Sequence, residues 1–109
     1  MNKDIIKEQE QSNDGKSLYL YYDRFAGLYL AFGLSAYYAM MAAEPQVSYS
    51  VELQMPVALL SRYNVLQLRQ GLTKVEHKVK EYYKFTMKRY VGNEGYERWK
   101  EGIAAKYNK

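Results

Sequence analysis

Hydrophobic and polar positions divide the chain into one long uncharged stretch and several shorter patterned segments. The uncharged stretch, GLYLAFGLSAYYAMMAA, covers residues 27–43, and small side chains recur in it every four residues. In a helix, residues four apart are neighbours on one face. The stretch therefore predicts a helix over residues 24–43, beginning as early as Ser17, that ends before Pro45. Its expected packing ridge consists of Gly27, Ala31, Ser35, Ala39 and Ala43.

A clean alternation follows in VSYSVEL, residues 47–53. Its apolar side chains share one face, and two serines and a glutamate share the other. This period predicts a half-buried strand. A single strand cannot pair its own backbone, so we expect it to pair with residues 17–22, with residues 65–69 or with the same strand of a second chain. The residues of this expected strand interface are Val47, Tyr49, Val51 and Leu53.

Two further segments carry signals for helix ends. Pro56 suits a first helical position and Gly71 a C-terminal cap, which predicts a helix over residues 56–70, with two short strands as the alternative. Thr73 and Glu76 match the capping-box pattern, which predicts a helix over residues 74–91 that ends at Gly92.

The C-terminal segment completes the expected fold. Asn93 is a candidate cap for a last helix, on which four residues share a face: Tyr96, Trp99, Ile103 and Tyr107. The segments together predict a mainly α, compact single domain over residues 17–109, with about four helices and a minor β element around residues 47–53. The alternative is an α+β fold with a small antiparallel sheet. Residues 1–16 are expected to be a mobile polar segment or a short exposed helix.

The uncharged stretch has other interpretations besides a buried helix. One is that part of its face meets a partner protein or a second copy of the chain. A single membrane span over residues 25–43 is the third, but three tyrosines, two glycines and a serine dilute its hydropathy, and no basic cluster flanks it. We therefore expect a helix buried in a water-surrounded core rather than a membrane partner.

The amino-acid composition excludes several kinds of functional site. A chain of 109 residues fits one domain. Cysteine is absent and His77 is the single histidine, so disulfides, thiolate sites and histidine clusters for a metal are excluded. The first residues alternate charges and lack an apolar run, so no secretory signal is expected, and the predicted location is cytoplasmic. The 13 tyrosines indicate a binding surface, because tyrosine combines a large apolar ring with one polar group.

Charge is concentrated in one segment. The chain carries a formal net charge of +4, and residues 72–91, with six Lys or Arg and two Glu, hold an excess of the same size. Such a local excess is typical of polyanion binding, although lysine-rich faces also serve solubility. On the expected helix over residues 74–91, the candidate phosphate contacts are Lys74, Lys80, Lys84, Lys88 and Arg89.

No pattern predicts catalysis. His77 has Glu81 four residues later, an ordinary surface pair, and no nucleophile stands at a meaningful spacing from it. We therefore expect a small non-enzymatic binding protein without a cofactor, acting as a protein–protein interaction, assembly, inhibitory or accessory module. Its partner would be another protein or a second copy of itself. A nucleic-acid-associated protein that uses the basic segment 74–91 is the alternative.

Overall fold

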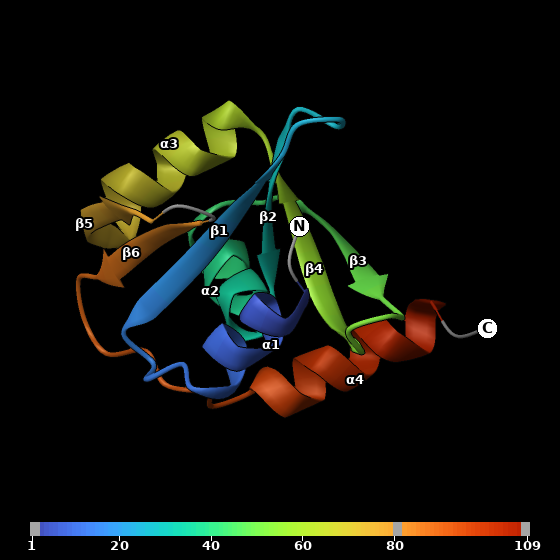
Figure 1. Cartoon of the computed structure of the whole chain (residues 1–109). Coiled ribbons are helices and arrows are strands. Elements are labelled where there is room, and N and C mark those ends of the chain that lie inside the picture. The colour runs from blue at the N-terminus through green and yellow to red at the C-terminus, as the bar shows by residue number, and fades with distance from the viewer. Residues whose placement is uncertain (1–2, 80–81, 108–109) are drawn as a thin grey trace.

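The structure is a computed structural model that describes residues 3–79 and 82–107. Four helices and six strands alternate irregularly within these residues (Figure 1). In chain order they are α1 (Lys3–Gln11), β1 (Ser17–Asp23), β2 (Leu28–Phe32), α2 (Leu34–Ala42), β3 (Gln46–Ser50), β4 (Met55–Leu60), α3 (Arg62–Gly71), β5 (Thr73–Lys78), β6 (Tyr83–Met87) and α4 (Tyr96–Tyr107).

The strands form one antiparallel sheet with the order β3-β4-β2-β1-β6-β5. The fold is therefore α+β, and the predicted mainly helical fold is wrong. The α+β alternative named the right class but expected a small sheet. The described part of the chain instead organises its helices around a sheet of six strands.

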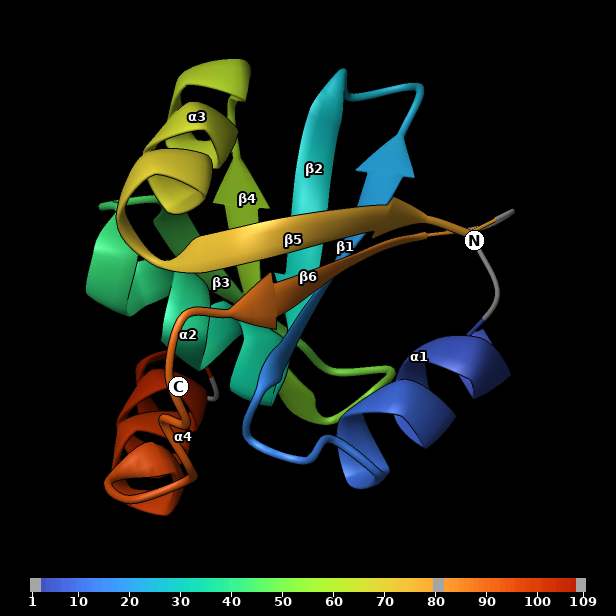
Figure 2. The same cartoon turned by 90° about the vertical axis from the view of Figure 1, so that its left-hand side faces the viewer.

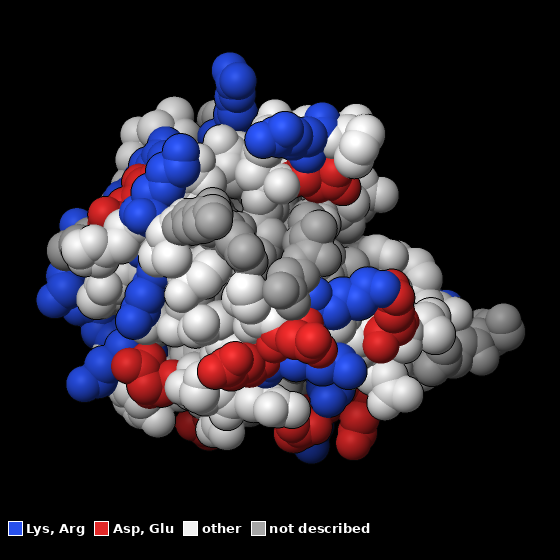
Figure 3. All heavy atoms as spheres, in the orientation of Figure 1, with Lys and Arg blue, Asp and Glu red and all other residues white. Residues whose placement is uncertain are grey.

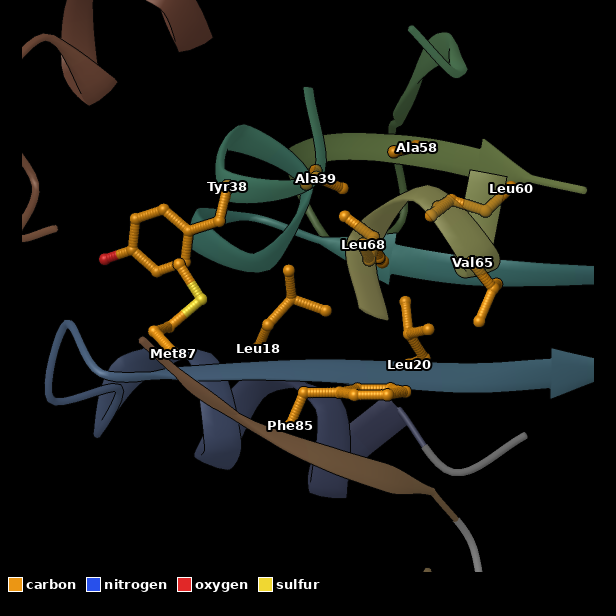
Figure 4. Packing of buried hydrophobic residues seen from close by; sticks show 12 residues of the cluster. Leu18, Leu20, Tyr38, Ala39, Ala58, Leu60, Val65, Leu68, Phe85 and Met87 are labelled. Atoms are coloured by element: carbon orange, nitrogen blue, oxygen red, sulfur yellow. The ribbon is translucent and has the colours of Figure 1, made fainter. Parts of the chain in front are cut away.

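Helices cover both faces of this sheet. Figure 2 shows α2, α3 and α4 on one side and α1 alone on the other. The larger core lies under α2 and α3, where Leu18, Leu20 and Phe85 of the sheet are almost fully buried (Figure 4). The smaller core lies under α1, where Ile6 packs with Tyr19 and neighbouring apolar side chains. Strand β1 thus buries alternate residues on opposite faces of the sheet.

The predicted helix over residues 24–43 is wrong except for its second half. Residues 24–27 form the turn between β1 and β2, and only α2 is helical. Two glycines explain the difference, because Gly27 has a φ of 67° and Gly33 a φ of 58°, both in the left-handed region that suits glycine. The small-residue ridge is therefore not one helix face. Its members fall in the turn, in β2, in α2 and just after α2: Gly27, Ala31, Ser35, Ala39 and Ala43.

The predicted strand over residues 47–53 exists as β3, but it ends at Ser50, and residues 51–54 form the turn into β4. Its partner is β4, which is none of the three expected partners.

The predicted helix over residues 56–70 is wrong in its first part. Pro56 lies in β4, and α3 begins only after Ser61, which forms a capping box with Asn64.

The predicted helix over residues 74–91 is also wrong, because its described residues contain no helix and most of them form the antiparallel pair β5–β6. Thr73 starts no helix, and its hydroxyl donates a hydrogen bond to the Leu68 carbonyl of α3 at 3.2 Å.

The expected last helix is confirmed as α4. Within residues 3–79 and 82–107, no helix combines the length and apolar character needed to cross a membrane.

Candidate polyanion interface

Positive charge gathers on α3, β5 and β6. Residues 62–91 contain eight Lys or Arg and two Glu, a net +6, whereas the rest of the chain sums to −2. We call the described residues of this range the basic lobe. Its elements touch one another through α3 on β5 and through the β5–β6 ladder. In Figure 3, blue atoms gather on the left of the molecule, where Figure 1 places these three elements.

The ladders that β6 forms with β5 and with β1 place lysines over tyrosine rings. Lys78 pairs in register with Tyr83, and its ammonium lies 5.9 Å from the centre of that ring. Lys84 pairs with Tyr19 of β1, and its ammonium lies 5.9 Å from that ring centre. Both distances fit cation–π contacts. Lys78 and Lys84 lie on opposite faces of the sheet, because Lys84 follows Tyr83, the register partner of Lys78, by one position.

Two other cations hold α3 against the hairpin. The Arg69 guanidinium donates two hydrogen bonds to the Glu76 carboxylate, at 2.9 and 3.0 Å. This bidentate pairing raises the pKa of Arg69. The Lys88 ammonium donates to the Gln70 carbonyl at 2.9 Å, in the last turn of α3. These two side chains have structural roles beside any role in binding.

The predicted phosphate contacts lie on a hairpin instead of on one face of a helix. Lys74 is exposed on β5 beside an irregularity in the strand register, and Lys84 is half-buried on β6. Lys88 and Arg89 follow β6 and are exposed. Lys80 lies outside the described residues. The structure therefore brings four of the five to one hairpin but spreads them over its two strands and the residues that follow it.

A row of tyrosines beside these cations was missed by the sequence analysis. Tyr22 and Tyr29 have ring centres 5.0 Å apart, and those of Tyr29 and Tyr83 are 6.0 Å apart. The row crosses β1, β2 and β6, and Tyr22 at its end is 46% exposed. Tyr29 and Tyr83 are half-buried against the larger core, so Tyr22 is the exposed ring of the row. The tyrosine content alone hinted at a binding surface, but the assembly of the row depends on the pairing of distant strands. We call these three residues the tyrosine row.

The expected strand interface is partly covered. β3 is an edge strand, and α4 packs against it. The Tyr107 hydroxyl of α4 donates a hydrogen bond to the Val47 carbonyl at 2.8 Å. Of the other expected interface residues, Tyr49 lies in β3, while Val51 and Leu53 lie in the turn that follows, with Val51 exposed and Leu53 buried. The four therefore do not form one free edge.

One carboxyl group of α1 is buried at the start of α2. Glu10 is 7% exposed and accepts a hydrogen bond from the Ser35 backbone N–H at 3.0 Å and one from the Ser35 hydroxyl at 2.7 Å. Burial raises the pKa of Glu10 to about 7, and the hydrogen bonds from Ser35 and Asn13 oppose this only in part. No sequence pattern pointed to Glu10.

His77 is exposed on β5, opposite Lys84, and Glu81 lies outside the described residues. Residues 3–79 and 82–107 contain no group of three or more His, Asp or Glu placed to hold a metal ion.

A hollow of ≈ 550 Å³ lies between the end of α2 and α3. Its lining residues are Met40, Met41, Ala42, Ala43, Glu44, Tyr63, Asn64 and Gln67.

No known family model matches the chain, and comparisons with curated proteins and with solved structures find no match.

Proposed function

We propose that the protein binds nucleic acid through the basic lobe. The observation that carries this proposal is the separation of charge, with +6 on residues 62–91 and −2 on the remainder. A surface of this kind attracts phosphates without regard to base sequence, and its affinity falls as salt rises. The exposed cations that we assign to phosphate contact are Lys74, Lys78 and Arg89.

The tyrosine row supports the same proposal. Aromatic side chains beside cations are the elements with which proteins bind single-stranded nucleic acid, because every base has a face that can stack.

The lysines of β5 also fit a second role, because lysines on an edge strand prevent unwanted pairing between sheets. Nucleic-acid binding and edge protection predict different results. Only nucleic-acid binding requires that the cations of the basic lobe matter more for affinity than equal charges elsewhere on the protein.

The test compares two double variants by fluorescence anisotropy of a labelled 20-nucleotide strand and its duplex at low salt. Lys74→Glu with Arg89→Glu changes the lobe, and Lys7→Glu with Lys106→Glu makes the same change in net charge on α1 and α4, where both side chains are exposed. The proposal expects about a tenfold or larger loss of affinity for the first pair and a loss of less than about threefold for the second. Equal losses, or no binding by the natural protein, would reject it.

A protein–protein interaction module is the second candidate, and the hollow between α2 and α3 favours it. Met41 and Tyr63 line this hollow and are 47% and 67% exposed. Methionine and tyrosine are common at interfaces, where they adapt to or anchor a partner. Light scattering that finds only monomer, together with affinity purification that recovers no protein partner, would remove this candidate. The cysteine-free chain fits a cytoplasmic setting for either function.

A further inference from the structure

Helix α1 is joined to the sheet by few buried groups. Among its residues, only Ile6 and Glu10 are buried. Gln9 adds a hydrogen bond from its amide to the Tyr82 hydroxyl at 3.2 Å, and Lys3 forms an ion pair with Glu52. The Lys3 and Glu52 side chains are half exposed or more, so their ion pair contributes little. The buried part of the α1 attachment is therefore one apolar side chain, Ile6, and one carboxyl group, Glu10, and the partly buried Ile5 packs against the same apolar cluster.

The Glu10 carboxyl is bound by groups that serve both of its protonation states. Ser35 N–H donates to Oε1, and the Ser35 hydroxyl, which accepts from Tyr19 N–H at 3.0 Å, lies 2.7 Å from Oε2. A hydroxyl both donates and accepts, so the pair persists when the carboxyl carries a proton. The ionised form keeps these bonds but must also hold a charge in a buried place, which is costly.

Phenols dominate the titratable surroundings of Glu10. The charge of Glu10 acts on Tyr19 and Tyr21 of β1, Tyr38 of α2 and Tyr96 of α4, and together with burial it raises the pKa of each. Tyr82 contacts the first two rings. The other charged or ionisable groups on α1 or on this face of the sheet include Lys84, whose ammonium lies over the Tyr19 ring, and His77, its register partner on β5. They also include Lys3, Asp4, Lys7, Glu8, Asp14 and Glu52. Because phenols ionise well above neutral pH, Glu10 is the group of this cluster that changes charge there.

We propose that α1 is a strap that stays on the sheet while the Glu10 carboxyl is protonated and lifts from it as the carboxyl ionises, uncovering the aromatic cluster around Tyr19, Tyr21 and Phe32. The larger core on the opposite face of the sheet does not include α1, so it persists when the strap lifts. Lifting also returns the Glu10 carboxylate to water, where its charge is solvated.

The direction of the pH effect follows from the raised pKa. The pKa of Glu10 is about 7 with α1 in place and 4.5 in water. A raised carboxyl pKa stabilises the attached state fully below the lower value, and this stabilisation is lost as pH rises through the higher one. Between pH 5 and pH 8, the ratio of attached to lifted α1 falls on the order of 70-fold.

Hydrogen exchange measured by mass spectrometry tests the strap, with rates corrected for the intrinsic effect of pH. From pH 5 to pH 8, we expect amide protection of residues 3–11 to fall by tens of fold while that of α3 and β6 stays constant. Glu10→Gln, a neutral side chain of the same shape, should remove the pH effect on α1. Glu8→Gln, which changes an exposed carboxyl of the same helix, should retain it.

Three results would overturn the proposal. The first is protection of α1 that does not change with pH in the natural protein. The second is loss of protection in α1 together with α3 and β6, which would indicate global unfolding. The third is an unchanged pH effect in Glu10→Gln. The first two results come from the natural protein alone, so they decide the matter even if Glu10→Gln fails to fold.

Discussion

Lys78 and Tyr83 face each other across the β5–β6 ladder, with the ammonium 5.9 Å from the centre of the ring. Tyr83 in turn contacts Tyr29, so the cation stands at one end of the tyrosine row and the exposed ring of Tyr22 at the other. Stacking and phosphate contact would therefore be available to one bound strand.

Tyr22→Ala tests the tyrosine row directly. If a base stacks on this ring, removing it should weaken binding of a single strand by about fivefold or more, since stacking on an aromatic ring contributes about 1–3 kcal/mol per base. Tyr107→Ala is the matched control, because Tyr107 is similarly exposed, at 44%, but belongs to α4 and not to the tyrosine row. Anisotropy titrations should show a loss for the first variant alone. Equal effects of both substitutions would contradict a role for the row.

Gly33→Ala distinguishes the observed fold from the helix expected over residues 24–43. In a helix interior, this change would stabilise the protein by roughly 1 kcal/mol. In the structure, Gly33 has a φ of 58°, and an added Cβ would lie 3.3 Å from the Tyr96 hydroxyl. We therefore expect a loss of about 1 kcal/mol or more in the free energy of unfolding, measured by urea denaturation.

Gly102→Ala is the control for the direction of this change in the free energy of unfolding. Gly102 lies within α4, and an added Cβ would meet nothing within 4 Å. The substitution should therefore raise the free energy of unfolding by up to about 1 kcal/mol, as expected for alanine in an open helical position. A stabilising Gly33→Ala would contradict the turn between β2 and α2.

Leu68→Ala measures the core under α3. The Leu68 side chain is fully buried among the sheet residues, so its truncation should lower the free energy of unfolding by about 2–5 kcal/mol. Leu66 lies two positions away on the same helix and is 46% exposed. Leu66→Ala should therefore lower the free energy of unfolding by less than about 1 kcal/mol. Comparable losses for both variants would mean that α3 does not pack as described.

The edge strand β3 was predictable because only one of its faces is apolar, which produces the alternation of VSYSVEL. Residues 17–22, which form most of β1, were left open between a strand and the start of a helix, because Leu18 and Leu20 pack under α2 and α3 while Tyr19 and Tyr21 pack under α1. A strand covered on both faces has no polar alternation, so its sequence resembles that of a buried helix. The two glycines with positive φ were the available signal for turns in this stretch.

The basic segment, residues 72–91, shows a different limit of prediction from sequence. A capping-box pattern at Thr73 favoured a helix, while the alternation of Tyr83, Phe85 and Met87 with Lys84 and Thr86 favoured the observed β6. The charge excess itself was predictable, because it depends only on composition. The tyrosine row and the burial of Glu10 were not predictable, since both depend on contacts between segments far apart in the sequence.

The salt dependence of nucleic-acid binding shows whether the basic lobe contacts phosphates. Affinities of the natural protein for a 20-nucleotide strand and its duplex would be measured by anisotropy at several salt concentrations between about 50 and 200 mM. If the basic lobe contacts phosphates, log affinity should fall linearly with log salt, with a slope of about −0.9 per phosphate contacted on duplex and about −0.7 on single strand. We expect slopes equivalent to about three contacts, one for each of Lys74, Lys78 and Arg89. Binding that is absent at the lowest salt, or that does not change with salt, would contradict nucleic-acid binding by the basic lobe.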